Sequence, residues 1–289
     1  MSECTVIQQR AFKDFKSIKL PETPASLEFE QFECCERLLV LADTTDSVGY
    51  KNDVTSAWIK LSDPTDTYSF NLTKDGNSTT YTPTVKAFVN EANAHYATIP
   101  WRDVLSNDGS GCYKLEIDYS IGGISGTLLW GEYNLQPFSI ENANTTCRIK
   151  VVLDLKQEIE RINFRDSNVV DTIRINGFIG NRQPNMEVDN LVYSDRKVKS
   201  VVRENLYTYE INTDPYKNDV ISRLTDLYLL SENEMYISDY NYHNHSHEIL
   251  DIPVIVTESP EIDYLENYQR RAVLNAVVSD KTTNKRTYY

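Results

Sequence analysis

The sequence has few cysteines and histidines, and it lacks the motifs that mark common enzyme classes. Its five cysteines show no C-x-x-C spacing, so we expect reduced, mostly buried thiols rather than a zinc or redox site. There is no G-x-x-x-x-G-K-[ST], H-E-x-x-H or G-x-G-x-x-G segment. The GGISG run at 122–126 lacks the last glycine of a nucleophile elbow, because Thr127 stands there. We therefore expect no enzymatic activity and no cofactor.

Long apolar runs are also lacking, and cations are outnumbered by anions. No stretch approaches the roughly 20 apolar residues that a membrane-spanning helix needs, and the N-terminus has no continuous apolar signal region. We expect no membrane association, and synthesis in the cytoplasm. The net charge of −14 repels polyanions, so we expect no specific nucleic-acid binding.

The first half of the chain contains short strand patterns separated by turn residues. Asp-Gly at 75–76 and Gly-Gly at 122–123 are typical of tight turns. The predicted strands lie at 37–43, 57–61, 68–72, 80–89, 112–119 and 127–133. This spacing predicts a β-sandwich domain over 26–140, after an N-terminal arm over 1–25 that is mobile or lies on a partner.

The second half combines further strand patterns with one helix. Strands are predicted at 147–155, 171–181, 207–211 and 235–238, with a closing hairpin over 261–280, and YSDRK at 193–197 as a turn between paired strands. Asp214 and Pro215 are typical of a helix start, and the apolar residues that follow recur with helical spacing, so we expect a helix near 215–230. The fold class is therefore mainly β: an N-terminal β-sandwich, then a β-rich (α+β) assembly domain over 141–280, then a C-terminal tail over 281–289.

Several segments resemble a type of virion structural protein, tail or neck ring, from tailed Bacteroidetes phages of the crAss-like kind. These segments are GCYKLEIDY (111–119), PFSI (137–140), TCRIK (146–150), IRINGFIGNRQP (173–184), YSDRK (193–197), YTYEINTDPY (207–216) and EMYISDYN (234–241). Their order and spacing carry the resemblance, since no single motif is diagnostic. The resemblance implies a non-enzymatic subunit of a homo-oligomeric ring in the virion. Its partners would be other tail, neck or portal-proximal proteins.

Two segments are candidates for contacts between subunits. The basic run at 196–199 and a tyrosine-rich loop at 236–248 stand out from an acidic chain. The candidate interface residues are Arg196, Lys197, Lys199, Tyr236, Tyr240 and Tyr242. The basic run could meet an acidic neighbour, or it could be a solvated strand edge whose lysines discourage unwanted pairing.

The same loop carries the only cluster of potential metal ligands. His243, His245 and His247 alternate, so on an extended segment their imidazoles point the same way and could bind zinc or nickel. The alternative is a polar loop whose histidines form hydrogen bonds or contact a neighbouring subunit.

A second class of function is a carbohydrate-binding β-sandwich module. Trp58, Trp101 and Trp130 would then supply stacking platforms for sugar rings. Tryptophans in a sandwich are more often part of the core, and an exposed indole would be needed to favour sugar binding.

Overall fold

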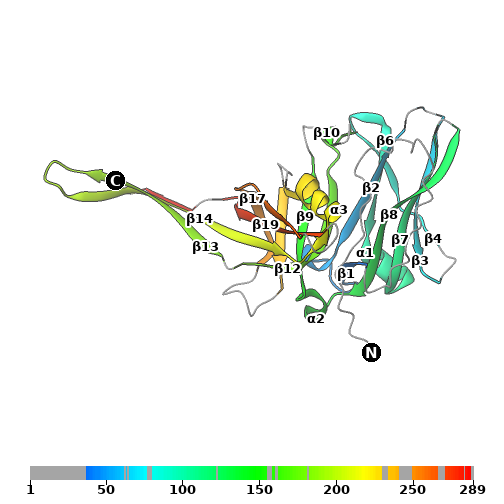
Figure 1. Ribbon diagram of the computed structural model, residues 1–289, viewed down its shortest axis with the longest axis horizontal. Helices are drawn as coiled ribbons and strands as arrows, with labels where there is room; N and C mark the ends of the chain where they lie inside the picture. The colour runs from blue at the N-terminus through cyan, green and yellow to red at the C-terminus, as the bar shows by residue number, and fades with distance from the viewer. Residues whose placement is uncertain are drawn as a thin grey trace.

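The protein is described by a computed structural model. The structure describes residues 37–61, 63, 65–76, 80–121, 123–154, 158–159, 162–180, 182–229, 234–240, 249–265, 271–282 and 284–287. The described chain is mainly β, as the sequence predicted, with short helical segments between the strands (Figure 1).

Strands from the first half form two sheets that pack face to face. The larger has the order β1 (Leu38–Ala42), β8 (Ile124–Pro137), β7 (Gly111–Ile121), β3 (Thr67–Lys74), β4 (Thr80–Tyr81). The smaller has the order β2 (Val54–Lys60), β6 (Glu91–Pro100), β5 (Val85–Phe88). Trp58 of the smaller sheet meets Trp130 of the larger edge to face, with ring centroids 5.0 Å apart. The alternating apolar residues of the two sheets thus bury each other, which is the packing of a β-sandwich.

The second half closes into a barrel. Its pairings run β14 (Val198–Thr213), β12 (Val169–Ile179), β9 (Thr146–Leu153), β16 (Glu234–Asp239), β17 (Ile249–Val256), β19 (Arg271–Asp280) and back to β14. Every pair is antiparallel. In-register positions such as Ile149, Ile173 and Ile237 lie on one buried face. Closure removes the open edges that a flat sheet of these strands would leave.

Four short strands accompany the barrel and the sandwich. β10 (Glu158–Ile159) pairs with β11 (Ile162–Asn163), and β15 (Tyr216–Lys217) and β18 (Glu261–Tyr264) both pair with β19. The β18–β19 pairing confirms the hairpin that the sequence predicted at the end of the second half.

The helix starts later than the sequence predicted. It runs as α3 over Asn218–Arg223 and continues as a π-helical segment over Leu224–Leu229. Pro215 is not its first residue, because the next residue, Tyr216, pairs with Ala272 of β19 and is fully buried. Burial of that large ring outweighs the local preference for a helix start at Asp214. The expected apolar face is buried: Val220, Ile221, Leu224, Leu227 and Tyr228.

Two regions without a sequence expectation also take regular structure. Residues 91–108 form β6 and α1 (Trp101–Asp108), and the connector after β8 contains α2 (Ile140–Ala143). Ser139 caps α2 by accepting a hydrogen bond from the backbone N–H of Asn142 at 3.1 Å. Cys147 is a free buried thiol, but Cys112 is disulfide-bonded, so the expectation of reduced thiols is wrong for Cys112.

The sandwich and the barrel share one core. A single cluster of buried apolar residues runs from Leu38 in β1 to Val278 in β19. A shared core neither confirms nor excludes two domains, so the predicted division of the chain near residue 140 stays a prediction.

One element leaves this body. β13 (Gln183–Val192) and β14 form a long hairpin that projects far from the sandwich and the barrel (Figure 1). From here on, "the arm" means residues 183–207 of this hairpin and not the predicted N-terminal arm over 1–25. β20 (Asn284–Thr287) pairs with β14 along the arm, so this part of the predicted tail is a strand on the chain's own arm.

Candidate assembly interface

The end of the arm is a tight turn that its sequence specifies. The backbone N–H of Arg196 donates to the carbonyl of Tyr193 at 2.9 Å, and that of Tyr193 donates to the carbonyl of Lys197 at 2.8 Å. Arg196 has φ of 67°, the left-handed conformation that closes three-residue hairpin loops. The turn predicted at 193–197 is thereby confirmed, and it places Arg196 and Lys197 at the outermost point of the arm.

The arm exposes apolar side chains that a soluble strand usually buries. Met186, Val188 and Val192 occupy alternate positions of β13 and are 64%, 44% and 68% exposed. Val198, which lies opposite Val192 in the register, is 62% exposed. Alternate positions share one face of a strand, so these four side chains lie on one side of the arm, with Asn190 between Val188 and Val192. We call these four side chains the apolar face.

The sequence of β13 alternates in the sense that a half-buried strand requires. From 183 to 189, polar residues alternate with apolar ones: Gln183, Asn185, Glu187 and Asp189. After Asp189 the pattern reverses at Asn190 and Leu191 and resumes at Val192. Such alternation is typical of a strand with one face on a core and one in water. Within the described residues, no core covers the apolar face of the arm. Exposed apolar side chains gathered on one face are a feature of protein-interaction surfaces, so the apolar face is a candidate interface.

The foot of the arm is fixed to the barrel. Arg182 forms an ion pair with Asp280 at 2.7 Å and lies over the ring of Tyr207, with its guanidinium carbon 3.5 Å from the centroid. The hydroxyl of Tyr209 donates to Asp280 at 2.9 Å. Burial and this bond to a carboxylate raise the pKa of Tyr209, so it remains a donor at neutral pH. The direction in which the arm leaves the body is therefore set by packed side chains.

The candidate interface residues fall into different environments. Arg196 and Lys197 are exposed at the tip, where Lys197 pairs with Asp195 at 3.1 Å. Tyr236 is half-buried on the barrel, with the ammonium of Lys150 4.0 Å from its ring centroid. The side chain of Lys199 and the whole of Tyr242 lie outside the described parts of the chain.

Tyr240 has a different place from the one expected. It is 1% exposed and packs with Leu41 and Ala143 in a small buried cluster, and its hydroxyl donates to the carbonyl of Tyr50. Its ring is held inside the chain because a phenol needs both apolar packing and a hydrogen-bond acceptor when it is buried. Tyr240 is therefore not available to a neighbouring subunit in this structure, which corrects its place among the interface residues.

The three predicted metal ligands, His243, His245 and His247, lie outside the described residues. In the ranges that the structure describes, no group of three or more His, Cys, Asp or Glu side chains could hold a metal ion.

All three tryptophans belong to the core. Trp58 and Trp130 face each other between the sheets, and Trp101 is fully buried, with its indole N–H donating to Thr55 at 2.8 Å. None of them offers a ring face to solvent. The proposed sugar-stacking platforms are therefore wrong, and the carbohydrate-binding alternative loses the residues on which it depended.

Sequence reasoning missed a cluster of buried charges where the sandwich meets the barrel. Asp53 lies just before β2 and receives Arg148 of β9 at 2.7 Å and Arg174 of β12 at 2.5 Å. All three side chains are at most 1% exposed. Asp251 of β17 pairs with the other end of Arg148 at 2.7 Å. We call Asp53, Arg148 and Arg174 the junction.

The electrostatics of the junction favour ionised Asp53. Burial alone would raise the pKa of its carboxyl, but Arg174 and Arg148 outweigh burial and lower it below the usual value. The backbone N–H of Leu41 also donates to this carboxylate at 2.8 Å. Asp53 is therefore a buried carboxylate whose oxygens accept hydrogen bonds from Arg148, Arg174 and Leu41.

A second buried pair links the same two parts of the molecule. Asp171 of β12 binds Arg223 of α3 at 2.5 Å and accepts from the hydroxyl of Tyr228 at 2.8 Å. Its other oxygen accepts from the backbone N–H of Ser56 in β2 at 3.0 Å. The carboxylate of Asp171 thus joins β12 of the barrel to α3 and to β2 of the sandwich. These bonds fix the relative positions of the three elements.

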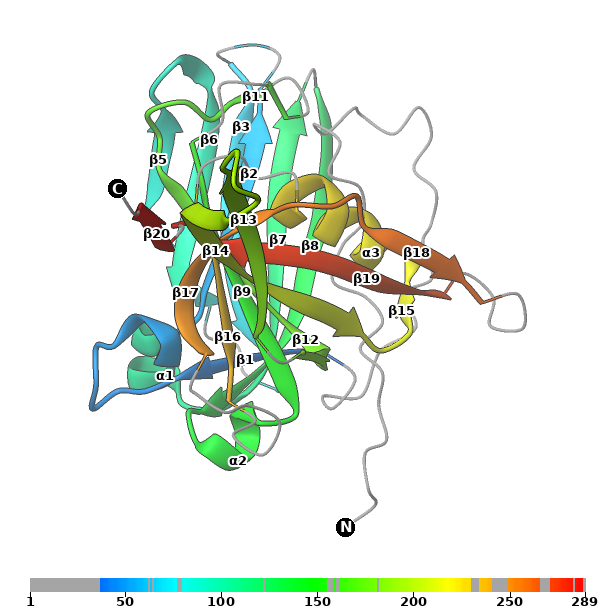
Figure 2. The same ribbon diagram turned by 90° about the vertical axis from the view of Figure 1, so that its left-hand side faces the viewer.

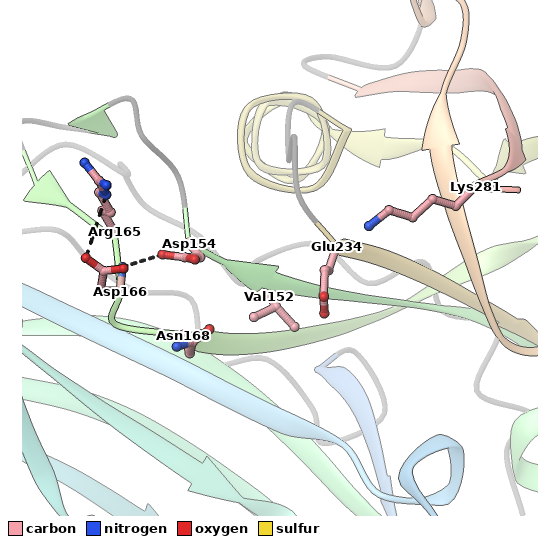
Figure 3. Close-up of a pocket in the computed structure, with 7 residues that line it drawn as sticks. All are labelled: Val152, Asp154, Arg165, Asp166, Asn168, Glu234 and Lys281. Carbon is pink, nitrogen blue, oxygen red and sulfur yellow. Dashed lines mark hydrogen bonds and ion pairs between the residues drawn. The ribbon is translucent and has the colours of Figure 1, made fainter.

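A pocket beside β9 has mixed charge. It has a volume of about 480 Å³ and is lined by Val152, Asp154, Arg165, Asp166, Asn168, Glu234 and Lys281. Figure 3 shows Arg165, Asp154 and Asp166 together at one end, and Lys281 at the other. Arg165 pairs with Asp166, and the backbone N–H of Asp166 donates to Asp154. The charges of Arg165, Asp166 and Asp154 are thus paired at one end of the pocket, away from Lys281.

Comparison with known proteins adds no assignment: no protein-family model and no curated protein matches the chain. Among the described residues, no helix has the length and apolar character needed to span a bilayer.

Proposed function

We propose that this protein is a non-enzymatic structural subunit that assembles with copies of itself into a closed ring, using the arm as its assembly element. The observation that carries the proposal is the apolar face of the arm, whose side chains of Met186, Val188, Val192 and Val198 stand in water in the single chain. Complete burial of one such side chain contributes about 1.5–3 kcal/mol. Burial of these four side chains against a neighbouring copy would therefore favour association.

The shape of the molecule favours a contact between different surfaces of neighbouring copies. The tip of the arm lies far from the body, so it can reach a surface on another copy that it cannot reach on its own chain (Figure 1). A contact between two different surfaces repeats from one copy to the next and closes into a ring when the rotation between copies fits. Each closed contact then adds to the stability of all the others.

The resemblance to virion proteins supports a more specific proposal. A ring made by this subunit would belong to a phage tail or neck, where it would connect neighbouring tail, neck or portal-proximal components. The subunit would be made in the host cytoplasm and reach the virion by assembly.

The direct experiment is mass photometry of the purified protein over a concentration series, with negative-stain electron microscopy of the assembled fraction. We expect a species of several copies with cyclic symmetry in its class averages. Monomers throughout the series, or open aggregates without cyclic order, would reject the proposal.

A further inference from the structure

The strongest remaining feature is a pocket on the barrel, next to the foot of the arm. It has a volume of about 280 Å³ and is lined by Glu210, Asn212, Glu258, Ser259, Glu261, Asn275, Ala276 and Val277. These residues come from β14, β18, β19 and the β17–β18 connection. Figure 2 looks at this side of the molecule, with β17, β18 and β19 toward the viewer. We call it the foot pocket.

The foot pocket combines three carboxylates with one apolar side chain. Glu210, Glu258 and Glu261 contribute three carboxylates, and no lysine or arginine lines the pocket. Val277 is the apolar side chain on the pocket side of β19, since Ala276 is 2% exposed and belongs to the core. Ile255 of the neighbouring strand β17 is 41% exposed. The pocket therefore suits an occupant that is both basic and apolar.

The tip of the arm has those two properties. The sequence at 196–199 is RKVK, with three cations and a valine, and the exposed Val192 and Val198 flank the turn. Asp195 is the only acidic residue from 190 to 203. Tip and pocket thus match in both charge and apolar character.

The overall charge of the chain makes this match significant. Two copies that each carry a net charge of −14 repel each other, so a productive contact between them needs a local region of opposite charge. The basic tip and the acidic foot pocket provide one on the same molecule, at opposite ends of the arm.

From this complementarity we infer that the tip of the arm of one copy docks in the foot pocket of the next copy. The inference rests on the proposed function, because it names the surface of the second copy that receives the arm. Arg196 and Lys197 meet the carboxylates of the pocket, while the valines beside the turn cover Val277 and Ile255.

A charge-exchange experiment tests the docking. One variant reverses the tip (Arg196→Glu, Lys197→Glu), and the other reverses the pocket (Glu258→Lys, Glu261→Lys). We expect each variant alone to associate about tenfold or more weakly than the wild type in mass photometry, the equivalent of about 1.4 kcal/mol per contact. A 1:1 mixture of the two should assemble again, because every tip then meets a pocket of opposite charge.

The outcomes separate this inference from the proposed function. If the wild type assembles but both variants assemble equally well alone, or the mixture fails to recover, the tip does not dock in the foot pocket and only this inference falls. If the wild type itself is monomeric, the proposed function falls as well. Recovery in the mixture also shows that both variants are folded.

A photo-crosslinking amino acid at position 197 provides a direct map of the contact. We expect a covalent dimer whose crosslinked peptide comes from residues 208–213, 249–265 or 271–280, the segments that line or border the pocket. Crosslinks confined to any other segment would overturn the inference.

Discussion

The junction buries charged side chains, and the arm exposes apolar ones, so both depart from the usual distribution of side chains. At the junction, charged groups that normally face water are at most 1% exposed, whereas on the arm apolar groups that normally avoid water are 44–68% exposed. Each buried charge has its partner within the same chain. The exposed apolar groups have no cover in the described structure. The junction is thus complete in one copy, and the arm is the part that a second copy would complete.

The comparison also separates two roles of polar groups. Buried ion pairs add little net stability relative to apolar packing, but breaking one leaves an uncompensated charge. The junction therefore acts mainly to fix how the sandwich sits on the barrel. A fixed body would hold the arm at a defined angle for the contact with a neighbouring copy that we propose.

The largest effect is expected at the junction. Asp53→Asn keeps the shape of the side chain but leaves Arg148 and Arg174 without their shared anion, so the free energy of unfolding should fall by about 3–5 kcal/mol. Urea unfolding of the dilute protein at pH 7 measures it. The matched control is Asp46→Asn, since Asp46 is ion-paired to Lys51 at 2.7 Å on the surface. We expect little change there. Equal effects of the two variants would remove the distinction on which the comparison depends.

A smaller effect is expected from pH. The pKa of Asp53 is lowered in the folded state, so its stabilising contribution is complete above its unfolded pKa of about 4 and is lost as pH falls through the folded value. The wild type should therefore lose more stability on acidification below roughly pH 4 than Asp53→Asn does, because the variant has no carboxylate to protonate there. Unfolding midpoints of both proteins between pH 6 and pH 3 test this. Parallel curves would mean that Asp53 does not titrate as its surroundings imply.

Local patterns predicted much of the fold. A continuous apolar run located β1, and alternating residues located β3, β7, β9 and β19. The turn residues at 193–197 located the end of the arm, because turn chemistry is encoded in neighbouring residues. The helix start failed where a tertiary contact, the burial of Tyr216, overrode a local signal. Residues 91–108 gave no usable pattern, since much of the inward face of β6 is small or aromatic rather than strongly aliphatic.

The candidate site was only partly readable. The basic tip could be found as a charge run, and the alternation of Met186, Val188 and Val192 is visible in the sequence, but its exposure depends on where the hairpin leaves the barrel. The junction joins residues 95 and 121 positions apart, and barrel closure joins β14 to both β12 and β19. No local pattern encodes such pairings.

The measurement that tests the central claim most directly compares two matched valines. Val192 lies on the apolar face of the arm at 68% exposure, and Val89 lies in the turn after β5 at 65% exposure. Replacing either by serine removes a similar exposed side chain, so both variants should keep the urea midpoint of the wild type. In sedimentation velocity over a concentration series, we expect Val192→Ser to weaken self-association by about tenfold or more and Val89→Ser to leave it unchanged. Unchanged association of Val192→Ser, or equal weakening by both variants, would contradict the assignment of the arm as the assembly element.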